Sequence, residues 1–193
     1  MNEADYLRLP PVLESIEAET KAIGFKMGSE RTAGSLLRTL AASKPAARFL
    51  ELGTGTGIST SWLLDGMDAD SFLTTVDNDA AGVEIARRRL GADRRVQFHV
   101  ADGSEFLDSL QGKLYDLIFA DTWPGKFRDL DLALALLAPG GFYVIDDLLP
   151  QLNWPEGHAP KVSGLMHSLS ERENLVICPM AWSSGLFLAV KKA

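Results

Sequence analysis

The fold is decided by ARFLELGTGTGISTSWLLDGMDADSFLTTVD, the stretch that runs from Ala47 to Asp77. An apolar run at 49–52 predicts a buried parallel strand, and it leads directly into the glycine-rich turn GTGTG. The apolar periodicity of 58–64 predicts a helix, and the run at 72–76 predicts a second strand that ends on Asp77. Strand, glycine turn, helix, strand and acid, in this order, are typical of a nucleotide-binding βαβ unit.

The spacing within the turn is G-x-G-x-G, and Glu51 precedes it by two residues. A dinucleotide site would instead have G-x-G-x-x-G, so NAD binding is a weaker alternative, as is a turn without a ligand. The pattern E-x-G-x-G-x-G resembles the first motif of the Rossmann-like S-adenosylmethionine-dependent methyltransferases. The resemblance implies that Asp77 accepts hydrogen bonds from the ribose hydroxyls of that cofactor. It implies further cofactor contacts at Glu51, Gly53, Thr54, Gly55 and Gly57.

The composition is that of a soluble globular protein, with 46% hydrophobic and 23% charged residues in a chain of 193. We expect one domain over residues 1–193, because this length is ordinary for a single domain. No apolar run approaches the roughly 20 residues that a membrane span needs. The acidic N-terminus lacks a secretory signal, and the single Cys178 cannot form an internal disulfide, so a cytoplasmic protein is expected.

The formal net charge of −7 argues against a nucleic-acid partner, since proteins that bind nucleic acids usually carry a basic face. Only short basic clusters are present, at 87–89, 94–95 and 191–192. A small-molecule substrate is therefore expected, without membrane association.

The chain on either side of residue 46 differs in organisation. Residues 1–45 are interpreted as a helical N-terminal cap or lid that could support a homodimer. Over 46–193, strands and helices alternate, which predicts an α/β fold with a seven-stranded, mostly parallel sheet and helices on both faces. The connection at 181–184 is too short for a crossover, so the last two strands are expected to form an antiparallel hairpin. The expected strands are 48–52, 71–76, 95–100, 114–120, 141–146, 174–179 and 185–191, and the expected helices are 11–23, 31–42, 57–66, 79–90, 103–110, 127–137 and 159–171.

Acidic residues follow four of the predicted strands, at the sheet edge where ligands of open α/β sheets bind. An acid followed by glycine after the third strand suits an adenine amine, although a helix cap is the alternative there. We expect most of these residues to contact the cofactor. They are Asp77 and Asn78, then Asp102, Gly103 and Ser104, then Asp121 with nearby Trp123, and finally Asp146 and Asp147.

Two longer runs, DLIFADTWPGKF at 116–127 and LAPGGFYVIDD at 137–147, resemble the small O-methyltransferases of the catechol and caffeoyl-CoA types. The resemblance implies that Asp121, Asp146 and Asp147 bind Mg²⁺ or another divalent cation. In that family a Met is followed, seven residues later, by a Gly, and here Met27 and Gly34 have this spacing. Ser59 lies where the family places a hydroxyl near the methionine carboxylate.

The predicted reaction is methyl transfer to a hydroxyl oxygen of a small molecule. A cation held by three carboxylates would lower the pKa of the acceptor hydroxyl, and a nearby base would take its proton. The predicted catalytic residues are Asp121, Lys126 and His158. Trp154 is expected to form a wall of the substrate site, within a stiff loop at 148–161.

The sequence departs from the family at two of these positions. Asp147 replaces an amide ligand, and Lys126 follows Asp121 by five residues instead of two or three, with Pro124 and Gly125 between them. A catalytically silent S-adenosylmethionine-binding protein is therefore an alternative. Another is a tRNA or nucleobase methyltransferase, because D-x-W-P at 121–124 is similar to a motif of some tRNA guanine methyltransferases.

Overall fold

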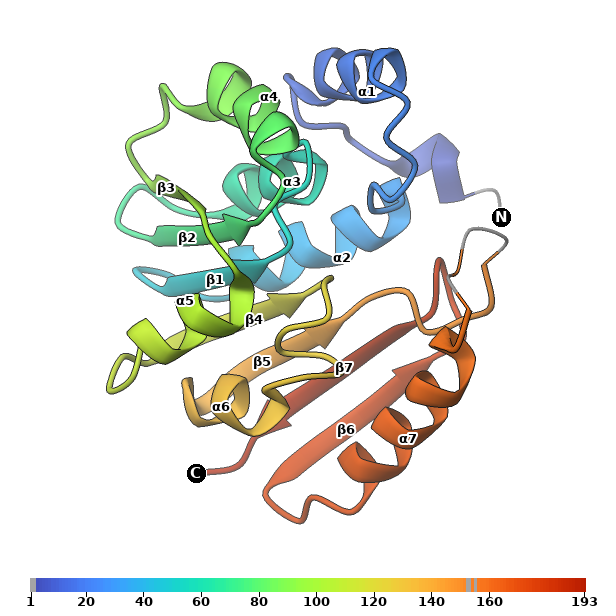
Figure 1. Ribbon diagram of the computed structural model, residues 1–193. Helices are drawn as coiled ribbons and strands as arrows, with labels where there is room; N and C mark the ends of the chain where they lie inside the picture. Colours follow the sequence, from blue (N-terminus) through green and yellow to red (C-terminus); the bar gives the residue numbers. More distant parts are fainter. Residues whose placement is uncertain (1–2, 152–153, 155) are drawn as a thin grey trace.

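The computed structural model describes residues 3–151, 154 and 156–193, which form a seven-stranded sheet in the order β3-β2-β1-β4-β5-β7-β6 (Figure 1). Strands β1 to β5 pair in parallel, whereas β7 is antiparallel to both β5 and β6. The predicted Rossmann-like sheet with a C-terminal antiparallel hairpin is confirmed. The strands are β1 (Arg48–Leu52), β2 (Phe72–Asp77), β3 (Val96–Val100), β4 (Tyr115–Ala120), β5 (Leu137–Ile145), β6 (Leu175–Met180) and β7 (Leu186–Lys191).

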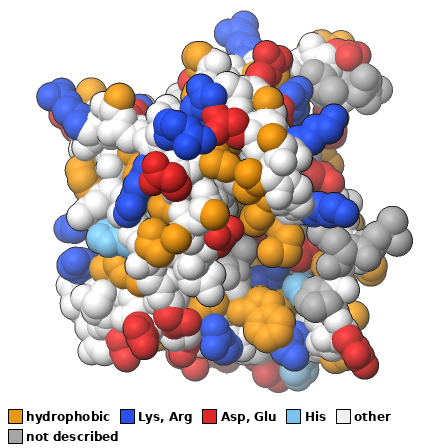
Figure 2. Space-filling view, turned by 45° about the horizontal axis from the view of Figure 1, so that its top comes forward, with side chains coloured by type: hydrophobic (Ala, Val, Ile, Leu, Met, Phe, Trp, Pro, Cys, Tyr) orange, Lys and Arg blue, Asp and Glu red, His pale blue; other side chains and the backbone are white. Residues whose placement is uncertain are grey.

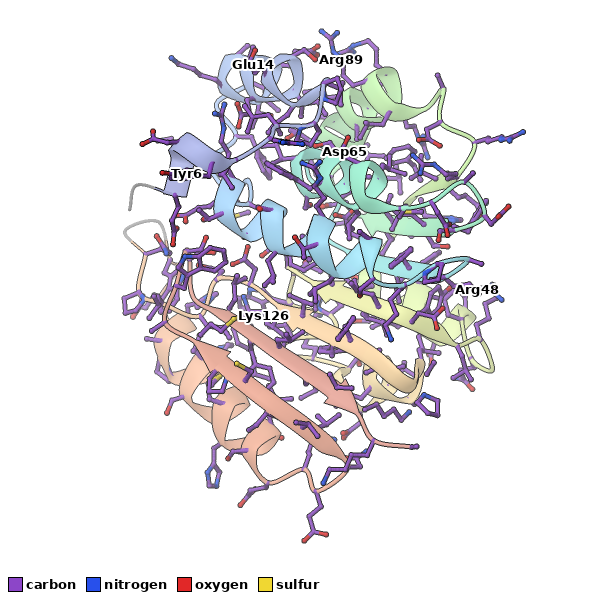
Figure 3. All side chains as sticks on the ribbon, turned by 180° about the vertical axis from the view of Figure 1, so that it is seen from behind. Tyr6, Glu14, Arg48, Asp65, Arg89 and Lys126 are labelled. Atoms are coloured by element: carbon purple, nitrogen blue, oxygen red, sulfur yellow. The ribbon has the colours of Figure 1, made fainter. Side chains whose placement is uncertain are left out.

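Helices cover both faces of this sheet, as the opposite views of Figures 1 and 3 show. Consecutive residues of a strand point to opposite faces, so Phe49 packs in the core beneath α1 to α4, and Leu50 packs in the core beneath α5 to α7. The helices are α1 (Leu13–Ala22), α2 (Arg31–Ala42), α3 (Ile58–Gly66), α4 (Ala80–Leu90), α5 (Gly103–Ser109), α6 (Leu130–Ala135) and α7 (His158–Ser170).

Glycines bring α2 very close to α3. A Cβ atom placed on Gly34 would overlap the indole of Trp62, and one placed on Gly66 would overlap the backbone of Arg38. Trp62 is fully buried at this crossing. The contact fixes the N-terminal helices on the sheet, and the connector between α1 and α2 is thereby held over the carboxyl ends of the strands.

Two predicted boundaries are wrong. The helix expected at 127–137 is only Leu130–Ala135, because Asp129 has a φ of 56° and lies outside the helical region. The strand expected from 141 begins at Leu137, which pairs with Tyr115 before an irregularity shifts the register to Leu117 with Phe142. A short 3₁₀ helix, Glu3–Tyr6, was not predicted.

Backbone hydrogen bonds continue the parallel ladder just past the strand ends. The N–H of Gly53 donates to the carbonyl oxygen of Val76 at 2.9 Å, and that of Asp121 donates to Leu52 at 2.9 Å. The Asp146 N–H donates to Ala120 at 3.4 Å. The residues that follow β1, β4 and β5 therefore lie side by side at one edge of the sheet.

No helix in the described part of the chain has the length and apolar character required to cross a membrane.

Candidate active site

A cavity of about 540 Å³ opens at the carboxyl ends of the strands. The glycine loop and the end of β2 form one side, and the segments that follow β4 and β5 form the other. The connector between α1 and α2 closes a third side. The lining residues are Phe25, Lys26, Met27, Gly28, Ser29, Glu30, Gly53, Gly55, Asp77, Asn78, Asp79, Asp121, Thr122, Trp123, Lys126, Asp146, Asp147, Gln151, Trp154, His158 and Ser184.

The glycine loop presents backbone to the cavity at Gly53 and Gly55. Gly53 has a φ of 108°, and a Cβ atom there would lie 3.0 Å from the carbonyl oxygen of Asp121, so the site requires glycine. Gly57 does not line the cavity; it begins α3 and packs closely against Ala86 of α4. Thr54 is buried, and its hydroxyl shares a 2.6 Å hydrogen bond with that of Thr75.

Glu51 lies beneath the loop, fully buried, and does not line the cavity. The hydroxyls of Thr60 and Thr75 donate to its Oε2 at 2.5 and 2.7 Å. Burial raises the pKa of Glu51 to about 7, against the opposing effect of these hydrogen bonds. Glu51 thus joins β1, β2 and α3 beneath the glycine turn.

Asp77 and Asn78 line the cavity as predicted. Asp77 accepts hydrogen bonds from the backbone N–H groups of Gly55 at 2.8 Å and Asp79 at 2.9 Å. The cap of α4 is supplied by Asp79, whose side chain accepts from Ala81 at 3.0 Å. Asp77 is therefore not the cap residue, and its carboxylate organises the loop at the cavity wall.

Asp102 is a helix cap, which was the predicted alternative to an adenine contact. Its side chain caps α5 by accepting hydrogen bonds from the N–H groups of Ser104 and Glu105. The Ser104 hydroxyl donates to Asp129, and Gly103 packs against Pro124. None of the three predicted adenine contacts lines the cavity in the structure. Their role in cofactor binding stays a prediction.

The connector between α1 and α2 contributes residues that the sequence analysis missed. Phe25, Ser29 and Glu30 line the cavity, and the Ser29 hydroxyl donates to Asp121 Oδ2 at 3.2 Å. The connector has no periodic pattern that would have indicated them. The predicted Met27 also lines the cavity and is 68% exposed, whereas Ser59 borders only a smaller adjoining hollow of about 20 Å³.

Asp121, Asp146 and Asp147 meet on the far side of the cavity. Burial raises the pKa of Asp121 well above its usual range, and the Asp146 carboxylate adds to this shift. Burial also raises the pKa of Asp146, although the Ser184 hydroxyl and the Asp147 N–H both donate to its Oδ1. These acids were correctly predicted to converge, and Ser184 is a partner that the sequence analysis did not identify.

Lys126 points into this acidic group despite its unusual spacing from Asp121. Its Nζ donates to the carbonyl oxygen of Asp146 at 2.6 Å and lies 3.9 Å from Asp147 Oδ2. The side chain is only 3% exposed, and burial lowers the pKa of Lys126. Figure 3 labels Lys126 near the end of β5 and the start of α2.

An aromatic group lies beside the acids. His158 stacks on Trp154 with ring centroids 4.3 Å apart and meets the edge of Phe127 at 5.0 Å. Trp123, 40% exposed, meets Phe127 edge-on at 6.0 Å. The Trp154 Nε1–H donates to Asp147 Oδ1 at 2.6 Å. The predicted loop at 148–161 includes residues 152, 153 and 155, which lie outside the described residues.

His158 is the buried imidazole of this group. Neither ring nitrogen makes a hydrogen bond to a described residue, although Nε2 lies 3.5 Å from Asp147 Oδ2. Burial lowers the pKa of His158, and the charge of Lys126 lowers it further. Burial thus favours the uncharged form of this imidazole, which lines the cavity.

The predicted metal ligands do not fit a divalent cation as they stand. Within the described residues, no three His, Cys, Asp or Glu side chains are grouped so that they could hold a metal ion. Oxygens of Asp146 and Asp147 already accept hydrogen bonds, and the Lys126 ammonium lies beside them.

Curated proteins of similar sequence match about two thirds of the chain. Proteins from Mycolicibacterium vanbaalenii and Mycobacterium avium, both provisionally named O-methyltransferases, are 33% and 31% identical to the chain over 134 residues. Each alignment covers 66% of this chain but only 59% or 60% of the relative. The chain therefore spans about three fifths of the length of these curated relatives.

Solved structures share the fold. The O-methyltransferase TomG from Streptomyces achromogenes, in complex with SAM, has a TM-score of 0.85 at 23% identity and covers 97% of this chain and 92% of its own. An O-methyltransferase from Bacillus cereus, in complex with SAH, has a TM-score of 0.84 at 20% identity, with coverages of 96% and 93%.

A family model described as a methyltransferase domain matches residues 50–148. The matched segment runs from the strand before the glycine loop to the acids that follow β5. The match spans more than half of the chain, which therefore belongs to the methyltransferase domain family.

Proposed function

We propose that the protein transfers a methyl group from S-adenosylmethionine to a hydroxyl oxygen of a small molecule. The observation that carries this proposal is that a single cavity is lined both by the glycine loop with Asp77 and by the group of Asp121, Lys126 and His158. A cofactor on the first side and an acceptor on the second would share one enclosed volume. Such proximity is what a direct displacement requires.

The cofactor side fits a ligand with a ribose and an amino-acid end. Gly53 and Gly55 leave the loop backbone accessible, and the Asp77 carboxylate suits two ribose hydroxyls. Met27 lies on the opposite wall, in the connector between α1 and α2. When bound, S-adenosylmethionine supplies an electrophilic methyl group.

The acceptor side offers a base and a lysine amine that is held in place by hydrogen bonds. His158 lines the cavity, has no hydrogen-bond partner among the described residues and is favoured in its uncharged form by burial, so it can take the hydroxyl proton. The Lys126 ammonium can stabilise the resulting negative charge on the acceptor oxygen. The flat rings of Trp123 and Trp154 favour an acceptor that is itself planar.

A small acceptor is favoured over nucleic acid. A cavity of about 540 Å³ has the size of ordinary small-molecule sites. On the face seen in Figure 2, the lysine and arginine side chains lie among acidic and apolar ones rather than in a continuous band. The net charge of −7 also opposes a phosphate backbone.

The proposal is tested first by calorimetry with S-adenosylhomocysteine. We expect one binding site per chain, greatly weakened in Asp77→Ala and unchanged in Asp70→Ala, an exposed acid far from the cavity. The absence of binding would reject the proposal. A panel of hydroxylated aromatics with labelled cofactor then separates the enzyme from a silent binding protein, which would bind the cofactor without turnover.

We also propose a role for the N-terminal helices, an oligomeric state and a location in the cell. Residues 1–45 would act as a cap on a single domain, which is supported by the position of Phe25 to Glu30 on the cavity wall. A homodimer is proposed from the same helices, and a cytoplasmic location from the composition. Assistance by a divalent cation, which the family resemblance implies, is a separate question that a chelator decides.

A further inference from the structure

The acceptor side of the cavity contains a cation that belongs to the chain. Lys126 Nζ donates to the carbonyl oxygens of Asp146 at 2.6 Å and Asp147 at 3.4 Å. It is 3.9 Å from the Asp147 carboxylate, and it also attracts the charge of Asp121. One ammonium thus contacts the main chain of Asp146 and Asp147 and lies near the Asp147 carboxylate, and it acts on Asp121 through its charge alone.

The turn at Gly125 places Lys126 among the acids, although Lys126 follows Asp121 by five residues instead of the two or three that the family shows. Gly125 has a φ of 81°, and a Cβ atom there would overlap the side chain of Leu52. Its carbonyl oxygen accepts a hydrogen bond from the Tyr143 hydroxyl, and its N–H donates to Arg128 at 2.7 Å. This anchored turn directs the following lysine inward, beneath the end of β5.

The negative charges of the buried acids explain why a lysine ammonium lies beside them. Carboxylates buried side by side are costly unless a cation or hydrogen-bond donors receive them. Ser184 and the Asp147 N–H donate hydrogen bonds to the Asp146 carboxylate. Ser29 donates to Asp121, and Trp154 donates to Asp147. Lys126 supplies the positive charge that these neutral donors lack. A divalent ion entering the same group would have to displace the ammonium or be repelled by it.

We propose that Lys126 is the resident cation of the acceptor site and takes the place of a divalent metal ion. The ammonium then offsets part of the negative charge of Asp121, Asp146 and Asp147 and holds the acceptor oxygen by a charge-assisted hydrogen bond. The role at the acceptor oxygen rests on the proposed methyl transfer. The exclusion of a metal does not, so it can be tested separately.

The test is calorimetric titration with Mn²⁺, an ion well suited to carboxylate oxygens, in the absence of cofactor and acceptor. The wild type is expected to show no saturable Mn²⁺ binding. Lys126→Ala and Lys126→Met remove the ammonium beside the acids, so the carboxylates of Asp121, Asp146 and Asp147 can turn from their present arrangement toward a shared ion. These variants are expected to bind one Mn²⁺ per chain, about tenfold or more tightly than any residual wild-type binding. Lys113→Ala, which removes an exposed lysine far from the cavity, should behave as the wild type.

A second substitution identifies the site. Adding Asp121→Asn to Lys126→Met should abolish the gained binding, because one of the three carboxylates is lost. Lys126→Met keeps an aliphatic stem in the buried position, and an Mn²⁺-dependent rise in its melting temperature gives a second readout. Saturable binding of Mn²⁺ to the wild type that Asp121→Asn removes would overturn the proposal. So would folded Lys126 variants that bind Mn²⁺ no better than the wild type.

Discussion

The backbone N–H of Gly55 donates a 2.8 Å hydrogen bond to Oδ2 of Asp77, which ties the glycine loop to the end of β2. The two features that indicated a nucleotide-type site in the sequence are therefore one unit in the structure. Asp77 shapes the loop and also offers its carboxylate to the cavity. Any change at this position is expected to affect the loop and the ligand together.

Substitution of Asp77 should separate these two effects. Asp77→Asn keeps an oxygen that can accept from Gly55, whereas Asp77→Ala removes both acceptors. Loss of two hydrogen bonds that the ribose hydroxyls would donate to the charged Asp77 carboxylate is expected to weaken S-adenosylhomocysteine binding about 100-fold in Asp77→Ala. Calorimetry measures the affinity, and thermal melting should show less destabilisation for Asp77→Asn. Equal affinity of Asp77→Ala and wild type would contradict the assigned role.

The crossing of α2 and α3 predicts a strong effect of a single methyl group. Gly34→Ala would force its Cβ atom into the Trp62 indole, so we expect a loss of about 1–3 kcal/mol in the free energy of unfolding. Gly164→Ala on α7 is the matched control, because no atom lies within 4 Å of its added Cβ. Alanine in a helix is favoured over glycine, so this control should gain about 0.5–1 kcal/mol. Urea denaturation measures both.

The raised pKa of the buried Glu51 predicts that the stability of the protein depends on pH. Its pKa is about 7 in the folded protein against 4.5 for the free side chain, so the native state favours the protonated form. The associated stability is present below pH 4.5 and is lost as the pH rises through about 7, a total change of about 3 kcal/mol.

The Glu51→Gln variant isolates this contribution, because it resembles protonated Glu51 at every pH. The difference in unfolding free energy between wild type and variant should therefore move against the wild type between about pH 5 and about pH 8. Other titrating acids, including Asp121 and Asp146, are present in both proteins and cancel in the difference. A difference that does not change with pH would show that folding leaves the pKa of Glu51 unchanged, which would contradict the prediction.

Trp154 should affect the acceptor and not the cofactor. Trp154→Ala removes the ring stacked on His158 and the hydrogen bond to Asp147, so kcat/KM for a planar acceptor is expected to fall about tenfold or more. Trp154→Phe keeps a ring but no N–H donor, and should have an intermediate value. Phe72→Ala, at an exposed position on the start of β2, is the control. A change in S-adenosylhomocysteine affinity in Trp154→Ala would show that Trp154 contributes to cofactor binding, which would contradict this prediction.

If Lys126 is the resident cation, methyl transfer should not need an added metal. Turnover in excess chelator is expected to stay within about twofold of the untreated rate, since no metal-bound oxygen is required. The same assay with Lys126→Met should show a large loss that Mg²⁺ does not restore in full, because a lysine N–H donor is also missing. Loss of wild-type activity in chelator, recovered with Mg²⁺, would refute metal independence.

The sheet and its helices were predictable because their signals are local. The alternation of apolar segments and the short connection at 181–184 define a parallel sheet with a terminal hairpin. The errors occurred where tertiary contacts decide the backbone, as at Asp129, which leaves the helical region, and at Leu137, which pairs with Tyr115. Periodicity carries no information on such positions.

Three of the four predicted groups of strand-end acids line the cavity, at Asp77, at Asp121 and at Asp146 with Asp147, whereas Asp102 caps α5 instead. Parallel register brings Asp121 and Asp146 together whatever the rest of the chain does. Ser29 and Ser184 reach the same acids from a connector and a hairpin turn, over sequence separations of 92 and 38 residues. The inward direction of Lys126 depends on a turn with positive φ, which no spacing rule describes.

The terminal hairpin also sets an order of assembly. Strand β7 lies between β5 and β6, and Ser184, just before β7, donates to Asp146. A nascent chain that has left the ribosome only as far as β6 has no partner for the outer edge of β5, and Asp146 lacks one of its donors. Exposed strand edges of this kind favour association with other chains. The acceptor side of the cavity is thus complete only after β7 has been synthesised and has paired with β5.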